Sequence, residues 1–198
     1  MKCNLALGWI LFSIIASSAT VSVADDVPIN LRNAGGAKCS DLIQAFDKNS
    51  GGNQTAYLQW AAGYATAVAQ SNQVIDVYPL SETLGLIEMA LLICQEPEFH
   101  DSRYQTVLLN AIERLRPFWA TTPSVVTLNG PDNASISIYS DSIKPLQEAL
   151  INLGIRMPAD GNFGTLTGGA LSQLHKSLGL TETPIPSGIS LYALTKPK

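Results

Sequence analysis

Residues 160–164 of the sequence read Asp-Gly-Asn-Phe-Gly, and Thr-Leu-Thr follows at 165–167. Two glycines around one aromatic residue are typical of a tight turn, because glycine reaches positive φ without steric cost. Phe163 is expected to anchor the turn to an apolar core. A helical stripe of apolar residues comes next, made up of Ala170, Leu171, Leu174 and Leu178. The stretch predicts a turn and a helix, and it indicates no reaction.

Two further helices are expected around this turn. Asp141 or Ser142 can cap a helix that ends at Gly154, and Pro186-Ser187 can begin a short last helix. Residues 141–198 would then form a three-helix domain with a very small core.

Residues 39–116 carry the periodicity of four helices. Apolar residues recur at three- and four-residue spacings in each of them. We expect helices that begin near Ser40, Gln54, Ser81 and Ser102. The third, at about 81–94, is the most apolar and is predicted to be the most buried. The predicted fold class is all-α, a four-helix bundle stapled by a disulfide and followed by the three-helix domain.

Residues 117–140 separate the two helical regions. They are rich in Pro, Thr, Ser, Asn and Val, and they lack a helical period. We interpret them as an interdomain linker that holds short extended pieces.

The N-terminus has the pattern of a secretory signal. Lys2 precedes the apolar run 5–15, and Ser22-Val23-Ala24 offers small residues before a cleavage point. A membrane anchor is the alternative, but the apolar run is about half of the ~20 residues that a span requires. We predict a signal peptide at 1–24, an irregular leader at 25–38, and a periplasmic or otherwise exported protein.

Three cysteines occur, and Cys3 lies inside the predicted signal. The remaining pair, Cys39 and Cys94, predicts one disulfide in an oxidising compartment. Such a bridge would stabilise the fold by roughly 4 kcal/mol. Two free buried thiols are the alternative.

Charge argues against two classes of partner. Removal of Lys2 from the 12 basic residues leaves 11 against 16 acidic ones, a net charge of −5. A protein that binds nucleic acid needs a basic face, and so does a protein that binds an anionic lipid surface. We therefore expect no nucleic-acid partner, and no membrane contact after signal cleavage.

The C-terminal pattern resembles the peptidoglycan-binding type 1 domain. The matching residues are Leu146-Gln147, Leu150, Leu153-Gly154, the 160–164 turn, Thr167, Ala170-Leu171 and Leu178-Gly179-Leu180. The resemblance implies a three-helix fold with a surface groove beside the turn that holds cell-wall glycan or its peptide stems. It implies that Asp160, Asn162, Phe163 and Thr167 contact this ligand. The chain departs from the family at Thr165 and Leu174-His175.

Residues 38–116 resemble, in fewer positions, the HdeA-like family of helical periplasmic proteins. The matching residues are Cys39 to Leu42, Trp60 to Tyr64, and Leu91 to Cys94. This likeness implies an acid-stress chaperone. The segment is also similar to the periplasmic immunity proteins that block cell-wall amidases.

No set of residues forms a recognisable catalytic or metal site. The two histidines, His100 and His175, fall in different predicted domains, whereas a zinc hydrolase needs three ligands in one place. The carboxylates near Glu96 fit a solvated loop better than a glycosidase pair. We predict a non-enzymatic protein without cofactor or metal, which binds peptidoglycan through its C-terminal domain and presents a helical domain to a protein partner. The alternatives are an acid-stress chaperone and an inhibitor of a wall-degrading enzyme.

Overall fold

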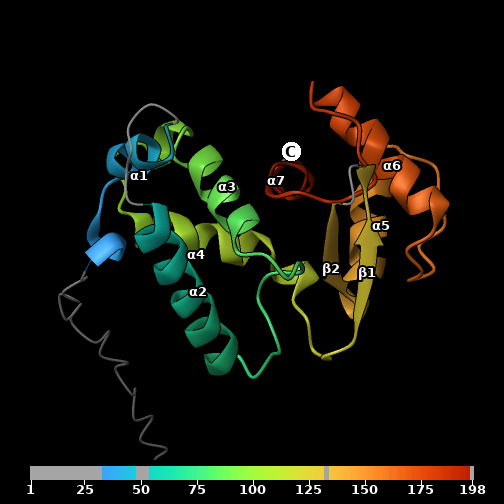
Figure 1. The fold of residues 1–198 in the computed structure, drawn as a ribbon, viewed down its shortest axis with the longest axis horizontal. Helices are drawn as coiled ribbons and strands as arrows, with labels where there is room; N and C mark the ends of the chain where they lie inside the picture. Colours follow the sequence, from blue (N-terminus) through green and yellow to red (C-terminus); the bar gives the residue numbers. More distant parts are fainter. Residues whose placement is uncertain (1–32, 48–53, 132–133, 197–198) are drawn as a thin grey trace, which may run out of the picture. The chain divides into compact units, whose positions relative to one another are not determined.

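A computed structural model describes residues 33–47, 54–131 and 134–196 (Figure 1). The predicted signal peptide, Cys3 and the leader up to residue 32 lie outside the described residues. The elements are helices α1 (Cys39–Phe46), α2 (Gln54–Ser71), α3 (Leu84–Ile93) and α4 (Tyr104–Arg114), strands β1 (Val125–Asn129) and β2 (Ser135–Tyr139), and helices α5 (Ile143–Asn152), α6 (Thr165–Ser177) and α7 (Gly188–Thr195). Short 3₁₀ helices include Asn33–Gly36, Pro97–Phe99, Arg116–Phe118 and Ser140–Ser142.

The first four helices lie close to the predicted ranges, and their apolar faces meet in one core. α3 is the most apolar of them, with Leu86, Ile87, Met89, Ala90 and Ile93 buried. Leu84 starts the helix and is 47% exposed. α4 begins at Tyr104, two residues after the expected Ser102, and Arg103, which precedes it, makes no side-chain cap hydrogen bond.

The predicted disulfide is confirmed. Cys39 and Cys94 are bonded across a Cα–Cα distance of 5.4 Å, and both side chains are buried. The bond joins the start of α1 to the residue that follows α3, so it fixes the first residue of α1 to the end of α3.

The all-α prediction is wrong, because the 117–140 stretch contains an antiparallel β-hairpin. β1 pairs with β2 over five residues, with Val126 opposite Ile138 and Leu128 opposite Ile136. Alternate residues of the two strands face inward, and Leu128 and Ile138 are buried. A period of two with β-branched residues favours strand over helix. The hairpin contributes side chains to the core as well as connecting the helices.

The last helix packs on the third. α7 contacts α3, α5 and α6, and Figure 1 shows α7 beside α3. The backbones of Gly85 and Gly188 touch, since a Cβ on Gly188 would meet the carbonyl oxygen of Gly85. Ser187 caps α7 and accepts a hydrogen bond from the backbone N–H of Ser190 at 3.2 Å. The described residues from Asn33 onward thus belong to one compact unit.

Candidate functional site

A buried glutamine organises the turn at 160–164. Gln147 comes from α5 and is 1% exposed. Its Oε1 accepts the backbone N–H of Gly161 at 2.8 Å, and its Nε2 lies 3.0 Å from Oδ1 of Asp160 and 2.9 Å from the carbonyl oxygen of Asn162. Because both ends of the amide have partners, its burial costs little free energy. Gln147 therefore holds the turn in one conformation.

The turn itself uses one glycine for its backbone conformation. Gly161 has φ of +77°, as the sequence predicts. Gly164 instead has φ of −116° and precedes α6 as its N-cap. A side chain at Gly164 would find open space, so this position keeps the surface beside the turn free.

The predicted site residues take different positions. Asp160 and Asn162 are exposed, whereas Thr167 is 1% exposed and lies 3.0 Å from Gln147 Nε2. The Thr167 hydroxyl also donates to the carbonyl oxygen of Asn162 at 3.3 Å. Thr167 thus supports the turn from its buried side, whereas Asp160 and Asn162 lie at the surface.

The carboxylate of Asp160 stays ionised at neutral pH. Backbone N–H donation from Asn162 is the main cause that lowers the pKa of Asp160, and Gln147 adds a second hydrogen bond. The second oxygen, Oδ2, makes none of these bonds. Asp160 can therefore accept a hydrogen bond from a hydroxyl, an amide or an ammonium group.

A small cavity of about 200 Å³ adjoins the turn. Asp160, Asn162 and Thr167 line it together with Gln147, Met157, Pro158, Gly164, Thr165 and Leu166. Leu166 is 64% exposed, the highest value among the large apolar side chains of the described residues. We name this the turn cavity. It combines one carboxylate with exposed apolar surface.

Phe163 does not line the turn cavity. It lines a groove of about 480 Å³ between β1 and α6. The turn cavity and this groove share only Gly164 and Thr165. The structure therefore brings three of the four predicted residues to one cavity and places the fourth in another.

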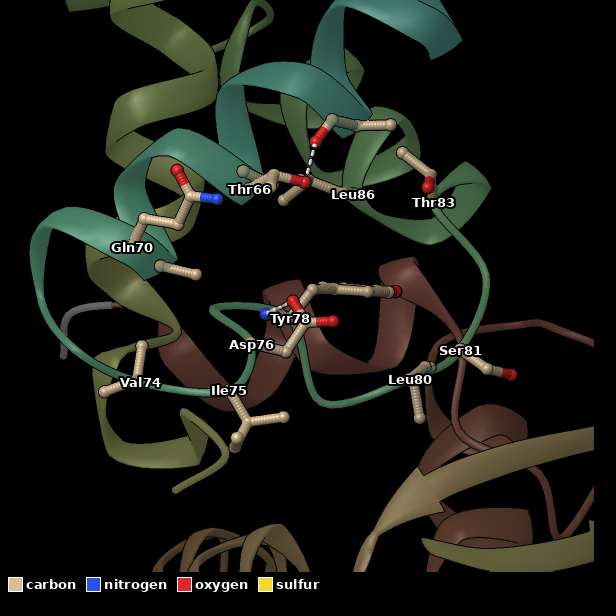
Figure 2. Close-up of a pocket in the computed structure, with 13 residues that line it drawn as sticks. Thr66, Gln70, Val74, Ile75, Asp76, Tyr78, Leu80, Ser81, Thr83 and Leu86 are labelled. Atoms are coloured by element: carbon tan, nitrogen blue, oxygen red, sulfur yellow. Dashed lines mark hydrogen bonds between the residues drawn. The ribbon is translucent and has the colours of Figure 1, made fainter. Parts of the chain in front are cut away.

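A further cavity, of about 300 Å³, lies among the N-terminal helices (Figure 2). The alanine face of α2, at Ala62, Ala65 and Ala69, forms one wall, and the segment that runs from Val74 to Thr83 forms the other. The carboxylate of Asp76 accepts the N–H of Tyr78 at 3.0 Å and the hydroxyl of Tyr139 at 3.1 Å. This cavity has no second carboxylate and no histidine in its lining.

Tyr78 is the unusual residue of that region. It is 3% exposed, and its hydroxyl is buried with no hydrogen-bond partner among the described residues. Burial raises the pKa of Tyr78 far above its ordinary value, and the charge of Glu88 adds to this. The hydroxyl lies against Gly85 and is closed off from solvent.

Gln147 is a functional residue that the predicted site does not include. It belongs to the Leu146-Gln147 pair of the family resemblance, which assigns it no ligand contact. A buried glutamine on the apolar face of a helix is the signal that could have identified it, because a buried amide needs several partners.

In the described part of the chain, no group of three or more His, Cys, Asp and Glu side chains could hold a metal ion. His175 is buried, and its Nδ1 lies 2.9 Å from the carbonyl oxygen of Thr183. Among the described helices, none combines the length and the hydropathy that crossing a bilayer requires. Comparison of the chain with protein-family models, with curated proteins and with solved structures found no match.

Proposed function

We propose that this protein is exported, is not an enzyme, and binds peptidoglycan at the turn cavity. The observation that carries the proposal is the meeting of Asp160 and Asn162 with the exposed Leu166 around one cavity that Gln147 holds in shape. A protein–glycopeptide contact needs polar groups for hydroxyls and amides, and apolar surface for methyl groups and sugar faces.

The charge of the cavity suits the peptide stem in particular. Oδ2 of the ionised Asp160 is available for a cationic ammonium group, and ionised acceptors make the stronger hydrogen bonds. Leu166 and Met157 offer surface for small aliphatic side chains. The predicted signal peptide and the disulfide support the same compartment, the bacterial envelope.

The N-terminal helices would present a rigid surface to a protein partner. The disulfide between Cys39 and Cys94 and the packing of α7 on α3 hold this region together with the proposed wall-binding site. In this arrangement, binding to the wall would position the helical region along it.

Co-sedimentation of the purified protein with insoluble peptidoglycan tests the proposal. Asp160→Asn keeps the oxygen that accepts from Asn162 and removes the charge, and Leu166→Ser removes apolar surface without exposing a core. We expect each variant to lower retention about tenfold, a loss of about 1.4 kcal/mol.

Two matched controls accompany these variants. Asp101→Asn changes a fully exposed carboxylate elsewhere, and Leu178→Ser changes an exposed leucine at the far end of α6. Both controls should bind like the native protein. Absence of retention by the native protein, or equal retention by all five proteins, would refute the proposal.

A further inference from the structure

The β-hairpin has one covered edge and one open edge. The outer edge of β2 is covered by the segment before α3, since Ser81 N–H donates to the carbonyl oxygen of Ser137 at 2.9 Å and Tyr139 N–H donates to Pro79 at 3.1 Å. The isolated bridge between Leu80 and Ile138 belongs to the same contact. This segment acts as a short third strand beside β2.

Among the described residues, none covers the outer edge of β1 in this way. At the two ends of the hairpin, Ser140 N–H donates to Ser124 and Gly130 N–H donates to Ala134, both at 2.8 Å. Donors and acceptors alternate along an antiparallel strand, so the backbone groups of Val125, Thr127 and Asn129 point away from β2. No backbone hydrogen bond involves these outward groups among the described residues.

The strand also lacks the usual protection of an open edge. Folded proteins block such edges with lysine, proline, a bulge or a covering loop. β1 reads Val-Val-Thr-Leu-Asn and pairs with β2 in a regular register without a bulge. Val125 is 50% exposed on it. An unprotected edge in a folded protein is a ready template for another strand.

The groove of about 480 Å³ runs beside this strand. β1 contributes Thr127, Leu128 and Asn129 to its lining. The opposite wall consists of small or apolar residues, namely Phe163, Gly164, Thr165, Gly168, Gly169, Ser172 and Pro184. Among the described residues, none of the lining side chains carries a charge, so the groove matches an uncharged occupant.

We propose that an extended, uncharged peptide segment of a partner protein binds in this groove and adds to β1 as a further strand. Only an extended backbone presents N–H and C=O groups with the spacing that the outward groups of Val125, Thr127 and Asn129 require. Gly164, just before α6, and Gly169 within it leave space for the side chains of the peptide, since a Cβ at either position would have no neighbouring side chain within 4 Å.

A second copy of this chain fits the groove poorly. Its own β1 edge is flanked by the same wall of α6 and Phe163, which would meet the wall of the first copy. A five-residue strand spans only about 17 Å. Pairing over that length buries far less than the roughly 1,200–2,000 Å² of a stable interface. The proposed occupant of the groove is therefore a single peptide segment.

The inference is independent of peptidoglycan binding. The peptide would contact β1 and Phe163, whereas peptidoglycan would contact Asp160 and Leu166, and the two cavities share only Gly164 and Thr165, which no variant changes. A variant of one site should leave the other unchanged, so the two proposals fail separately.

A capped pentapeptide, acetyl-Thr-Val-Thr-Val-Thr-amide, serves as the probe. Titration into ¹⁵N-labelled protein should shift the amide signals of Val125, Thr127 and Asn129. N-methylation of the probe at the alternate amides that face β1 should weaken binding about tenfold or more, because each lost donor leaves a buried acceptor unpaired. Methylation of the intervening amides should have little effect.

Two variants of the protein complete the test. Thr127→Pro removes an outward N–H that the hairpin does not use, and Thr127→Val keeps it. We expect Thr127→Pro to lose the probe and Thr127→Val to retain it, with similar thermal stability. Three results would overturn the inference: no shifts at millimolar probe, equal effects of both sets of methyl groups, or a native dimer that Thr127→Pro makes monomeric.

Discussion

The hydroxyl of Tyr192 donates a hydrogen bond of 2.8 Å to Oε1 of Glu96. Both oxygens of Glu96 also accept from the guanidinium of Arg114, each at 2.7 Å. The Glu96 and Arg114 side chains are only 13% and 12% exposed. This cluster fastens α7 to the turn that follows α3, across nearly half of the sequence.

The first prediction concerns how the free energy of unfolding changes at acid pH. Hydrogen bonding from Arg114 is the largest cause that lowers the pKa of Glu96. A carboxyl group whose pKa is lowered by folding stabilises the folded state at pH values above the ordinary pKa of glutamate, about 4.3. This stabilisation is lost as the pH falls through the pKa of the folded state. Glu96→Gln should therefore lower the free energy of unfolding by about 2 kcal/mol at pH 7, and by much less at pH 3.

Urea denaturation at the two pH values measures this difference. Glu98→Gln, an exposed neighbour, is the control and should change little at either pH. An equal loss for Glu96→Gln at pH 7 and pH 3 would show that the charge of Glu96 is not what stabilises the cluster.

The second prediction gives the opposite pH dependence of stability, because folding raises the pKa of Glu88. Its Oε2 accepts the N–H of Gly188 at 3.0 Å, yet burial is the main cause that raises the pKa of Glu88. A carboxyl group whose pKa is raised by folding stabilises the folded state at pH values below its ordinary pKa. This stabilisation is lost as the pH rises through the pKa of the folded state. Glu88→Gln resembles the protonated form and should leave stability at pH 7 unchanged or slightly increased. A clear decrease in the same urea experiment would contradict this assignment.

The third prediction tests the contact between α3 and α7. Gly188→Ala places a methyl group against the carbonyl oxygen of Gly85, and that backbone cannot move aside easily. We expect a loss of about 2 kcal/mol in the free energy of unfolding, typical of overpacking. Gly169→Ala lies in open space within α6, so it should instead stabilise by up to about 1 kcal/mol. Thermal denaturation of the two variants compares them directly.

The fourth prediction tests the role of Gln147. Replacement by alanine leaves the N–H of Gly161 without its acceptor and removes the amide that donates to the hydroxyl of Thr167. The expected cost is about 1–3 kcal/mol. Hydrogen exchange at the amide of Gly161 should become much faster, while Glu148→Ala, at the exposed neighbouring position, should leave it unchanged. Unaltered protection in Gln147→Ala would mean that other contacts hold the turn.

Much of the helical structure could be predicted from local pattern. α2 has apolar residues at three- and four-residue spacings over a long run, and periodicity is most reliable in such segments. The hairpin was missed because its strands have five residues each, and two short alternating runs resemble a polar linker. Its alternating Ile136 and Ile138 were the available signal.

The arrangement of the elements could not be predicted from the same patterns. The bond between Gly188 and Glu88 joins residues 100 positions apart, and no local spacing indicates it. Local spacing also does not indicate that Phe163 and Asp160 line different cavities, because the path of the turn decides which cavity each side chain faces. Tertiary packing settles both questions.

Titration of the ¹⁵N-labelled protein with a soluble disaccharide-peptide fragment of peptidoglycan tests the proposed function most directly. The proposal predicts that the amide signals of Gly161, Asn162, Leu166 and Thr167 shift with a common affinity, and that Asp160→Asn weakens that affinity about tenfold. Absence of any shift, or shifts confined to the cavity between α2 and the Val74–Thr83 segment, would contradict it.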